Sequence, residues 1–228
     1  MGTASALLRH PMKKILAALV LTMFLFVTSC SNNTLYQNKV KKSLRDVFGA
    51  TEMKQSEYLE TYTSSRWFYR DCDNVYCCFD FTGNNVHPDI LSWKPSGMDL
   101  QSYTAYNNYL TGDPSSPEDG PFGYLRVNMA DFKSGRDAEA FLCNNRLGPA
   151  PGDEVLEFKE DNDRYFVRAS EDNGVLVTTC VMWHVEGDTF VEIIFEYSFD
   201  IDRSYVESVI ELCDGLDVQH PEFATSIQ

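Results

Sequence analysis

The sequence lacks the common catalytic signatures. Its 228 residues contain no G-x-S-x-G elbow, no H-E-x-x-H helix and no glycine-rich phosphate loop followed by Lys and Ser or Thr. It also contains no C-x-x-C pair, and His87 and His184 do not stand at metal-ligand spacing to any cysteine pair. The sequence therefore predicts no catalytic residue, no metal site and no cofactor.

Cations are scarce in most of the chain. There are 19 Lys and Arg residues against 34 Asp and Glu residues, which gives a formal net charge of −15. The region up to Arg45 holds seven of those cations and none of the anions, so the rest of the chain is strongly acidic. Nucleic-acid binding rests on contacts between cations and phosphates, and the composition therefore excludes a nucleic-acid partner.

A long hydrophobic run is missing as well. The most apolar stretch, Ile15 to Val27, has thirteen uncharged residues, whereas a membrane-crossing helix needs about 20. Lys13 and Lys14 precede this stretch, and the small residues Thr28 and Ser29 follow it just before a cysteine. This order is typical of an export signal that is removed from the mature protein.

The residues Val27, Thr28, Ser29 and Cys30 resemble the lipobox of bacterial lipoproteins, and the resemblance covers only the first thirty residues. It implies that Cys30 becomes the lipid-modified mature N-terminus. It also implies a membrane-anchored lipoprotein of the bacterial cell envelope that faces the periplasm or the exterior. Met12 begins a cleaner version of the same signal, so the sequence leaves the start at Met1 or Met12 open.

Three segments follow from this interpretation. Residues 1–29 form the signal peptide, residues 30–38 form a polar lipid-anchored tether, and residues 39–228 form a single α+β domain. Two interpretations remain open for the cations Lys39, Lys41, Lys42 and Arg45. They form either a basic collar that contacts anionic lipids, at roughly 1 kcal/mol per cation, or one solvated face of a helix.

An even number of cysteines remains once Cys30 carries lipid. In an oxidising compartment this predicts disulfides, with fifteen pairings open to six residues. The candidates are Cys72, Cys77, Cys78, Cys143, Cys180 and Cys213. Cys77 and Cys78 are expected to point to opposite faces of one strand, and Cys180 is expected to face a cysteine of that N-terminal hairpin.

Hydrophobic patterning predicts an antiparallel sheet with two or more helices packed on one face, stabilised by disulfides. The predicted strands are a hairpin over 66–81, then 123–129, 165–169, 175–185 and 189–199, and the predicted helices begin at Asp99, Ser134 and Ser204. A three-residue turn at Asp172–Gly174 would pair Ala169 with Val177 and Val167 with Thr179.

The two later helices match each other at an offset of 70 residues, together with the strands that precede them. Either a duplicated strand-then-helix unit or convergent capping chemistry explains the match. If the unit is duplicated and its helices lie side by side on one face of the sheet, Cys143 and Cys213 come close enough to pair.

Few side chains qualify as site residues. Cys180 and His184 share a strand face, but four residues of strand separate them by roughly 13 Å, too far for proton transfer. His184 beside Glu192 is interpreted as a surface pair, and the acidic runs at Glu160–Asp163 and Asp200–Asp202 as solvated turns. An aromatic rim for a sugar or peptide is the remaining candidate, although its helical spacing also fits a packed core: Trp93, Tyr103, Tyr106 and Tyr109.

These observations predict a lipid-anchored, non-enzymatic binding or interaction domain of the bacterial envelope. Its partners would be the membrane, through Cys30, and an unknown envelope protein or small ligand. The alternative is a lipid-anchored envelope hydrolase with an unrecognised active site, and a structural lipoprotein is a third class. Binding is expected either on the partly solvent-exposed side of the strand 189–199, which carries Glu192 and Glu196, or on the segment from Trp93 to Tyr109.

Overall fold

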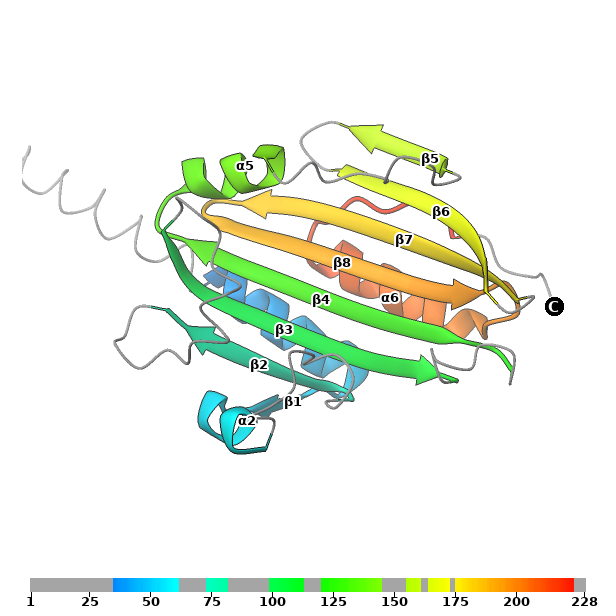
Figure 1. Cartoon of the computed structure of the whole chain (residues 1–228), viewed down its shortest axis with the longest axis horizontal. Coiled ribbons are helices and arrows are strands. Elements are labelled where there is room, and N and C mark those ends of the chain that lie inside the picture. The colour runs from blue at the N-terminus through cyan, green and yellow to red at the C-terminus, as the bar shows by residue number, and fades with distance from the viewer. Residues whose placement is uncertain are drawn as a thin grey trace, which may run out of the picture.

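The strands form one eight-stranded sheet in the order β1-β2-β3-β4-β8-β7-β6-β5 (Figure 1). The computed structural model describes residues 35–61, 73–81, 99–112, 120–144, 155–160, 164–172 and 175–223. The strands are β1 (Thr51–Met53), β2 (Val75–Asp80), β3 (Leu100–Thr111), β4 (Gly123–Phe132), β5 (Val155–Glu160), β6 (Arg164–Asp172), β7 (Val175–Glu186) and β8 (Thr189–Ser198).

The sheet is mixed, because β1 pairs with β2 in parallel while every other neighbouring pair of strands is antiparallel. The predicted purely antiparallel sheet is therefore wrong at one edge. The α+β class is confirmed. The longest connection between paired strands joins β4 to β8, and it contains the whole β5–β6–β7 meander.

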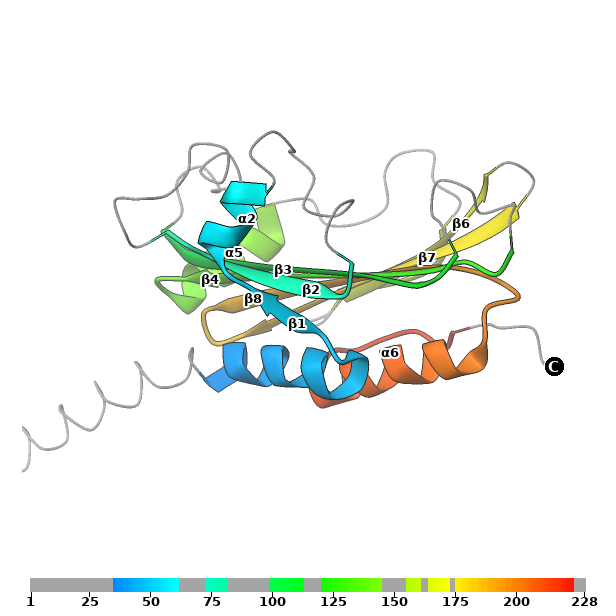
Figure 2. The same cartoon turned by 90° about the horizontal axis from the view of Figure 1, so that it is seen from below.

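Two helices pack on one face of the sheet, as predicted, but helices also cover the other face. The N-terminal helix (residues 35–48) and α6 (Arg203–Gly215) lie on one side, here called the helix face. The shorter helices α2 (Gln55–Thr61) and α5 (Gly135–Asn144) lie on the other side, here called the open face. Figure 2 shows the two layers edge-on.

One continuous apolar core lies between the sheet and the two long helices of the helix face. Val40 and Leu44 of the N-terminal helix and Val209 and Leu212 of α6 are all fully buried in it. They pack on alternate strand residues, because successive side chains of a strand point to opposite faces. The strand residues of this core include Val127, Met129, Met182, Ile193 and Phe195.

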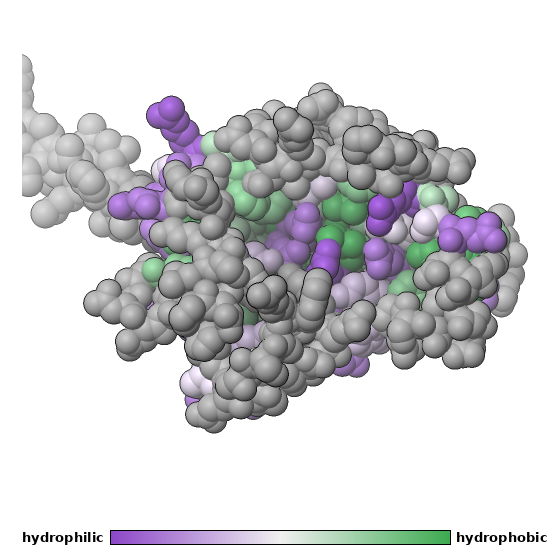
Figure 3. Space-filling model, in the orientation of Figure 1, coloured by the Kyte–Doolittle hydropathy of each residue, from purple (hydrophilic) through white to green (hydrophobic). Residues whose placement is uncertain are grey.

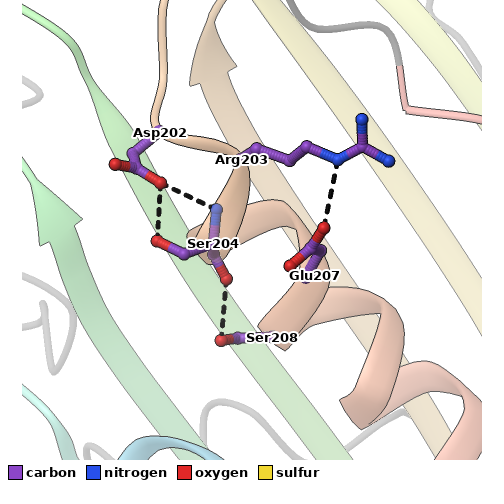
Figure 4. Close-up of polar contacts among 5 residues, drawn as sticks. All are labelled: Asp202, Arg203, Ser204, Glu207 and Ser208. Atoms are coloured by element: carbon purple, nitrogen blue, oxygen red, sulfur yellow. Dashed lines mark hydrogen bonds and ion pairs between the residues drawn. The ribbon is translucent and has the colours of Figure 1, made fainter.

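The helices begin at polar caps. At α5 the predicted capping pair is confirmed, since the Asp137 N–H donates to Ser134 Oγ at 3.3 Å. At α6 the predicted cap at Ser204 is wrong, because Asp202 is the N-cap and its Oδ1 accepts from the Ser204 N–H at 2.8 Å. Glu207, the expected capping partner, pairs instead with Arg203 one turn earlier (Figure 4).

The β6–β7 hairpin is shifted by one residue from the predicted register. Ala169 pairs with Thr178 and Val167 with Cys180, and Asp172 pairs with Val175. The prediction avoided this register because it places Arg168 and Ser170 on a face with Val177. Both faces of this sheet carry apolar residues, so placing the apolar set on a single face was the wrong criterion.

The predicted helix from Asp99 to Leu110 is also wrong, because these residues form the long strand β3. Leu100, Tyr103 and Tyr106 follow a helical spacing, and this spacing suggested a helix. In the structure both faces of β3 are largely buried, with Ala105 on the open face and Tyr106 on the helix face. A strand that is buried on both sides loses the period-2 signal.

None of the predicted disulfides joins two of the four cysteines Cys77, Cys78, Cys180 and Cys213. Cys77 and Cys78 do point to opposite faces, as predicted: Cys77 packs beside Tyr58 of α2, and Cys78 lies 3.6 Å from Gln37 Nε2. The Cys143–Cys213 pairing is wrong, because α5 and α6 lie on opposite sides of the sheet. The same placement argues against a duplicated strand-then-helix unit, whose two helices would lie on the same side.

Cys180 points toward α6 and not toward the N-terminal hairpin. It shares the helix-face core with Cys213, whose Sγ lies 3.8 Å from Met182 Sδ. Burial raises the pKa of the Cys213 thiol, so this thiol stays protonated in the folded protein.

The start of the chain lies largely outside the described residues, and so do Cys30, Cys72 and the first arm of the predicted hairpin. The residues predicted as a tether extend to 38, whereas the N-terminal helix already includes residues 35–38 and buries Tyr36. Among the described helices, none is both long and apolar enough to cross a membrane.

Candidate binding face of the sheet

The open face carries three separate apolar clusters instead of one core. The first lies under α5 and includes Phe132, Trp183 and Phe190. The second lies under α2 around Phe79, and the third lies at the opposite end of the long strands around Tyr124. Between these clusters the strands present polar side chains, and we call this group the polar band: Asn107, Arg126, Asn128, Arg168, Glu192 and Glu196.

The strand register brings the polar band together from four strands, β3, β4, β8 and β6, with β7 lying between the last two. Asn107 of β3 pairs with Arg126 of β4, and Asn128 of β4 pairs with Glu192 of β8. Glu196 shares its row with Thr179 of β7, and Thr179 in turn pairs with Arg168 of β6. Opposed residues in adjacent strands have Cβ atoms about 4.5–5.5 Å apart, so each row forms a continuous polar contact line.

Both carboxylate oxygens of Glu192 accept a hydrogen bond from a neighbouring strand. Asn128 Nδ2 donates to Oε1 at 2.8 Å, and Trp183 Nε1 donates to Oε2 at 3.0 Å. Asn128 and Trp183 flank Glu192 on the two adjacent strands, so the carboxylate is fixed in orientation by donors on either side. A carboxylate held in this way is a preorganised acceptor on a rigid element.

The rest of the polar band is balanced in charge. Arg126 sits diagonally between Glu192 and Glu196, because its direct partner on β8 is Ile194. Arg126, Arg168, Glu192 and Glu196 are each partly exposed, and the Nε atoms of both arginines are buried. Glu196 makes no hydrogen bond or ion pair with the described part of the chain that would fix its carboxylate. Two guanidinium and two carboxylate groups thus share one patch.

Figure 3 shows the open face with a hollow near the middle of the sheet, where hydrophilic and hydrophobic residues lie next to each other. On the third apolar cluster the rings of Tyr109 and Tyr124 lie 5.2 Å apart, next to the row of Glu196. The Tyr109 N–H donates to Asp73 Oδ1 at 2.7 Å, which fixes this part of β3. Asn107, Asn128 and Tyr124 are buried, so the face can offer one ligand the partly exposed charged groups and the ring of Tyr109.

The predicted aromatic rim is divided between the two faces. Tyr106 is fully buried on the helix face, where its hydroxyl donates to Asn74 Oδ1 at 3.1 Å and burial raises its pKa. Tyr103 and Tyr109 lie partly exposed on the open face, and Trp93 lies outside the described residues. The described tyrosines therefore do not form one rim, although Tyr109 borders the polar band.

His184 and Glu192 lie on opposite faces, so the surface pair suggested by the sequence does not form. Glu192 is level with Trp183, and His184 is level with Val191. His184 instead lies on the helix face, with its ring 5.9 Å from that of Tyr36 and its Nε2 3.8 Å from Glu186. Cys180 shares this face with His184, as predicted.

A second polar cluster lies on the helix face, around a buried aspartate. Asp131 accepts hydrogen bonds from Ser102 Oγ, from Thr189 Oγ1 at 2.7 Å and from Gln37 Nε2 at 3.1 Å. Burial raises the pKa of Asp131, and the hydrogen bonds from Ser102 and Thr189 lower it in part. Gln37 belongs to the N-terminal helix, so this cluster fastens that helix to the sheet.

The other acidic candidates have structural surroundings. Asp202 caps α6, and Ser198 Oγ donates to Asp200 Oδ1 at 2.7 Å. The run at 160–163 lies mostly outside the described residues. Within the described part of the chain, no three His, Cys, Asp or Glu side chains gather closely enough to hold a metal ion.

Sequence patterns identified two members of the polar band and missed the others. Glu192 and Glu196 were identified because they are acids on the partly solvent-exposed side of a strand whose apolar residues alternate. Arg126, Asn128 and Arg168 also alternate with apolar residues on their strands, but their meeting depends on the order β4-β8-β7-β6. That order is not visible in any local pattern.

Comparison with known proteins gives little further information. No family model matches the chain, and no curated protein matches it. Among solved structures, the extracellular domain of PknH from Mycobacterium tuberculosis is similar at 11% identity and a TM-score of 0.37, over 54% of this chain and 67% of that one. LpqN of M. tuberculosis, described as involved in cell envelope biogenesis, is similar at 12% identity and a TM-score of 0.25, over 55% of this chain and 79% of that one. Likenesses this slight carry no argument about function.

Proposed function

We propose that this protein is a lipid-anchored binding domain of the bacterial cell envelope. Cys30 carries the lipid, and the open face of the sheet binds a polar ligand that is neutral overall and carries hydroxyl and amide groups. The observation that carries the proposal is the polar band, a charge-balanced group of six side chains on the open face.

The chemistry of the polar band supports this ligand class. Binding sites use a small number of fixed polar groups for orientation and apolar groups for contact area. Glu192 is a fixed acceptor, the partly exposed arginines supply donors, and the partly exposed Tyr109 supplies ring surface. Because the band has two cations and two anions, it has no net charge with which to favour a strongly charged ligand.

Titration of the isotope-labelled protein with a neutral tetrasaccharide of N-acetylglucosamine, followed by nuclear magnetic resonance, tests the site. We expect amide signals of β4 and β8 around Arg126 and Glu192 to shift, and those of α6 to stay in place. The variant Glu196→Gln should weaken binding, and the matched control Glu211→Gln, on the exposed side of α6, should not. Shifts confined to α6 would contradict the proposed site.

The hydrolase alternative has less support. It required His184, Glu192 and a Ser or Thr to converge in one cleft, and His184 and Glu192 lie on opposite faces of the sheet. Glu192 and Glu196 are separated by four residues of strand, or roughly 13 Å. The carboxylate pairs of most glycosidases are about 5–9.5 Å apart, so this pair is too widely spaced along the strand for that chemistry.

A further inference from the structure

We infer that one end of the sheet faces the lipid bilayer, with Leu35 at the membrane surface, so that the open face looks sideways along the membrane. This end, here called the anchor end, comprises Leu35, the β7–β8 turn at Gly187–Asp188 and the start of α5 at Gly135. The inference rests on the proposed lipid at Cys30 and adds an orientation and a membrane contact to it.

Covalent geometry limits the distance between the lipid and the fold. Four residues separate Cys30 from Leu35, and the five Cα–Cα steps between them span at most about 18 Å. Strand β7 has twelve residues, and its first and last Cα atoms are about 36 Å apart at 3.3 Å for each of the eleven steps between them. The bilayer is therefore within reach of the end where the N-terminal helix begins, and the far end of β7 can be held away from it.

The parts of the anchor end are tied to one another. The Phe132 N–H donates to the Asp188 carbonyl at 2.9 Å, which joins β4 to the β7–β8 turn. Gln37, two residues after Leu35, donates to Asp131 on the same end of β4. In Figures 1 and 2 the N-terminal helix begins at the end of the sheet that carries this turn and α5. Hydrogen bonds to β4 therefore hold the turn and the start of the N-terminal helix together at the anchor end.

Leu35 is the most exposed of the large hydrophobic side chains described, at 64%. It stands at the first described position after the proposed lipid, where an apolar side chain gains by entering the headgroup boundary. The other two exposed large hydrophobics, Leu176 and Phe199, lie at the far end of the β7–β8 hairpin, beyond its last paired residues Val177 and Ser198. Phe199 therefore provides a matched control for Leu35.

Charge on α6 argues against the domain lying on its helix face. The exposed charged residues of α6 are Arg203 and the three acids Glu207, Glu211 and Asp214. Of the four cations in the predicted basic collar, Lys39 pairs with Asp217 and Lys42 pairs with Asp46, so half of its charge is paired with acids. Anionic headgroups attract cations and repel acids, so an upright position on the anchor end avoids the α6 acids.

The test uses the lipidated protein on phosphatidylglycerol vesicles that contain lipids with a nitroxide headgroup. A ketone-bearing amino acid places one fluorophore at a time at Leu35, at Glu211 on α6, at Ser170 on the open face or at Phe199, all exposed positions. This label leaves the cysteines unchanged. We expect quenching at Leu35 to exceed quenching at the other three positions several-fold.

Flotation with the vesicles is measured first. Protein that does not float overturns the lipid anchor, and with it both the proposed address and the orientation. Protein that floats but is quenched at Glu211, Ser170 or Phe199 as strongly as at Leu35 overturns the orientation alone. With the label at Glu186, Leu35→Asp should lower quenching and Phe199→Asp should not; equal effects would overturn the contact of Leu35 with the membrane.

Discussion

The two faces of the sheet are built differently. On the helix face, two long helices cover one continuous core whose members are almost all fully buried. On the open face, two short helices cover separate apolar clusters, and the polar band lies between them. The same strands form both faces, so the difference comes from which alternate residues are apolar. We therefore expect the helix face to supply most of the stability and the open face to hold the polar groups that a ligand could contact.

The largest effect that can separate the faces is the loss of a leucine from a covering helix. Leu212→Ala in α6 should reduce the free energy of unfolding by about 4 kcal/mol, and Leu142→Ala in α5 by about 2 kcal/mol. Both leucines are buried, but Leu212 is packed in a continuous core, whereas the shorter α5 can shift to close the cavity. Urea unfolding of the two variants measures the difference, and equal losses would show that the faces contribute alike.

Sequence reasoning succeeded where one face of a strand alternates clearly with the other. In β8 the residues Val191, Ile193 and Phe195 alternate with Glu192 and Glu196, and the strand and its faces were predicted correctly. In β3 apolar and aromatic residues occupy both faces, so a helical spacing was mistaken for the dominant period. Local hydrophobic patterns identify strands with one solvent-exposed face and fail for strands that are buried on both faces.

The candidate site was harder to predict for a different reason. Arg126 and Arg168 are 42 positions apart in the sequence and come to one face only because β8 and β7 lie between their strands. Placement of the helices has the same cause: the sequence marks where α5 and α6 begin, but the side of the sheet on which each packs depends on the path of the chain between strands. Long-range topology therefore determines the site.

A smaller effect is expected inside the polar band. Glu192→Gln leaves one oxygen to accept hydrogen bonds where Asn128 and Trp183 now donate to two. Leaving a partly buried donor unsatisfied costs about 1–3 kcal/mol, so the variant should lose about 1 to 2 kcal/mol of unfolding free energy. Equilibrium unfolding checks the loss, and a variant as stable as the wild type would indicate that water replaces the missing acceptor.

The buried acid of the helix face, Asp131, should make the free energy of unfolding depend on pH. Because burial raises the pKa of Asp131, the unfolded chain releases this proton at a lower pH than the folded protein does. Stability therefore falls as pH rises from the ordinary pKa of 3.8 through the raised value. Asp131→Asn should remove this fall, as measured by urea unfolding at a series of pH values.

Asp217 serves as a control of opposite sign. The hydrogen bond from Lys39 lowers the pKa of Asp217, so its contribution is present above the ordinary pKa and is lost as pH falls through the lowered value. Asp217→Asn should therefore remove a loss of stability on acidification, whereas Asp131→Asn removes a loss on neutralisation. If both variants changed the pH profile in the same direction, the role assigned to Asp131 would be wrong.

The smallest expected change in stability is also the one that most directly tests the comparison of the two faces. Glu196 is partly exposed and makes no hydrogen bond with the described residues that Gln would break, so Glu196→Gln should alter the unfolding free energy by less than about 0.5 kcal/mol. Its carboxylate nevertheless lies in the polar band, diagonal to Arg126, and its loss leaves the patch with an excess of positive charge. Binding of the neutral tetrasaccharide should weaken while folding stays intact, whereas Glu211→Gln should change neither. A substantial loss of stability in Glu196→Gln would mean that the polar band holds the fold together, and the open face would then be a second structural face.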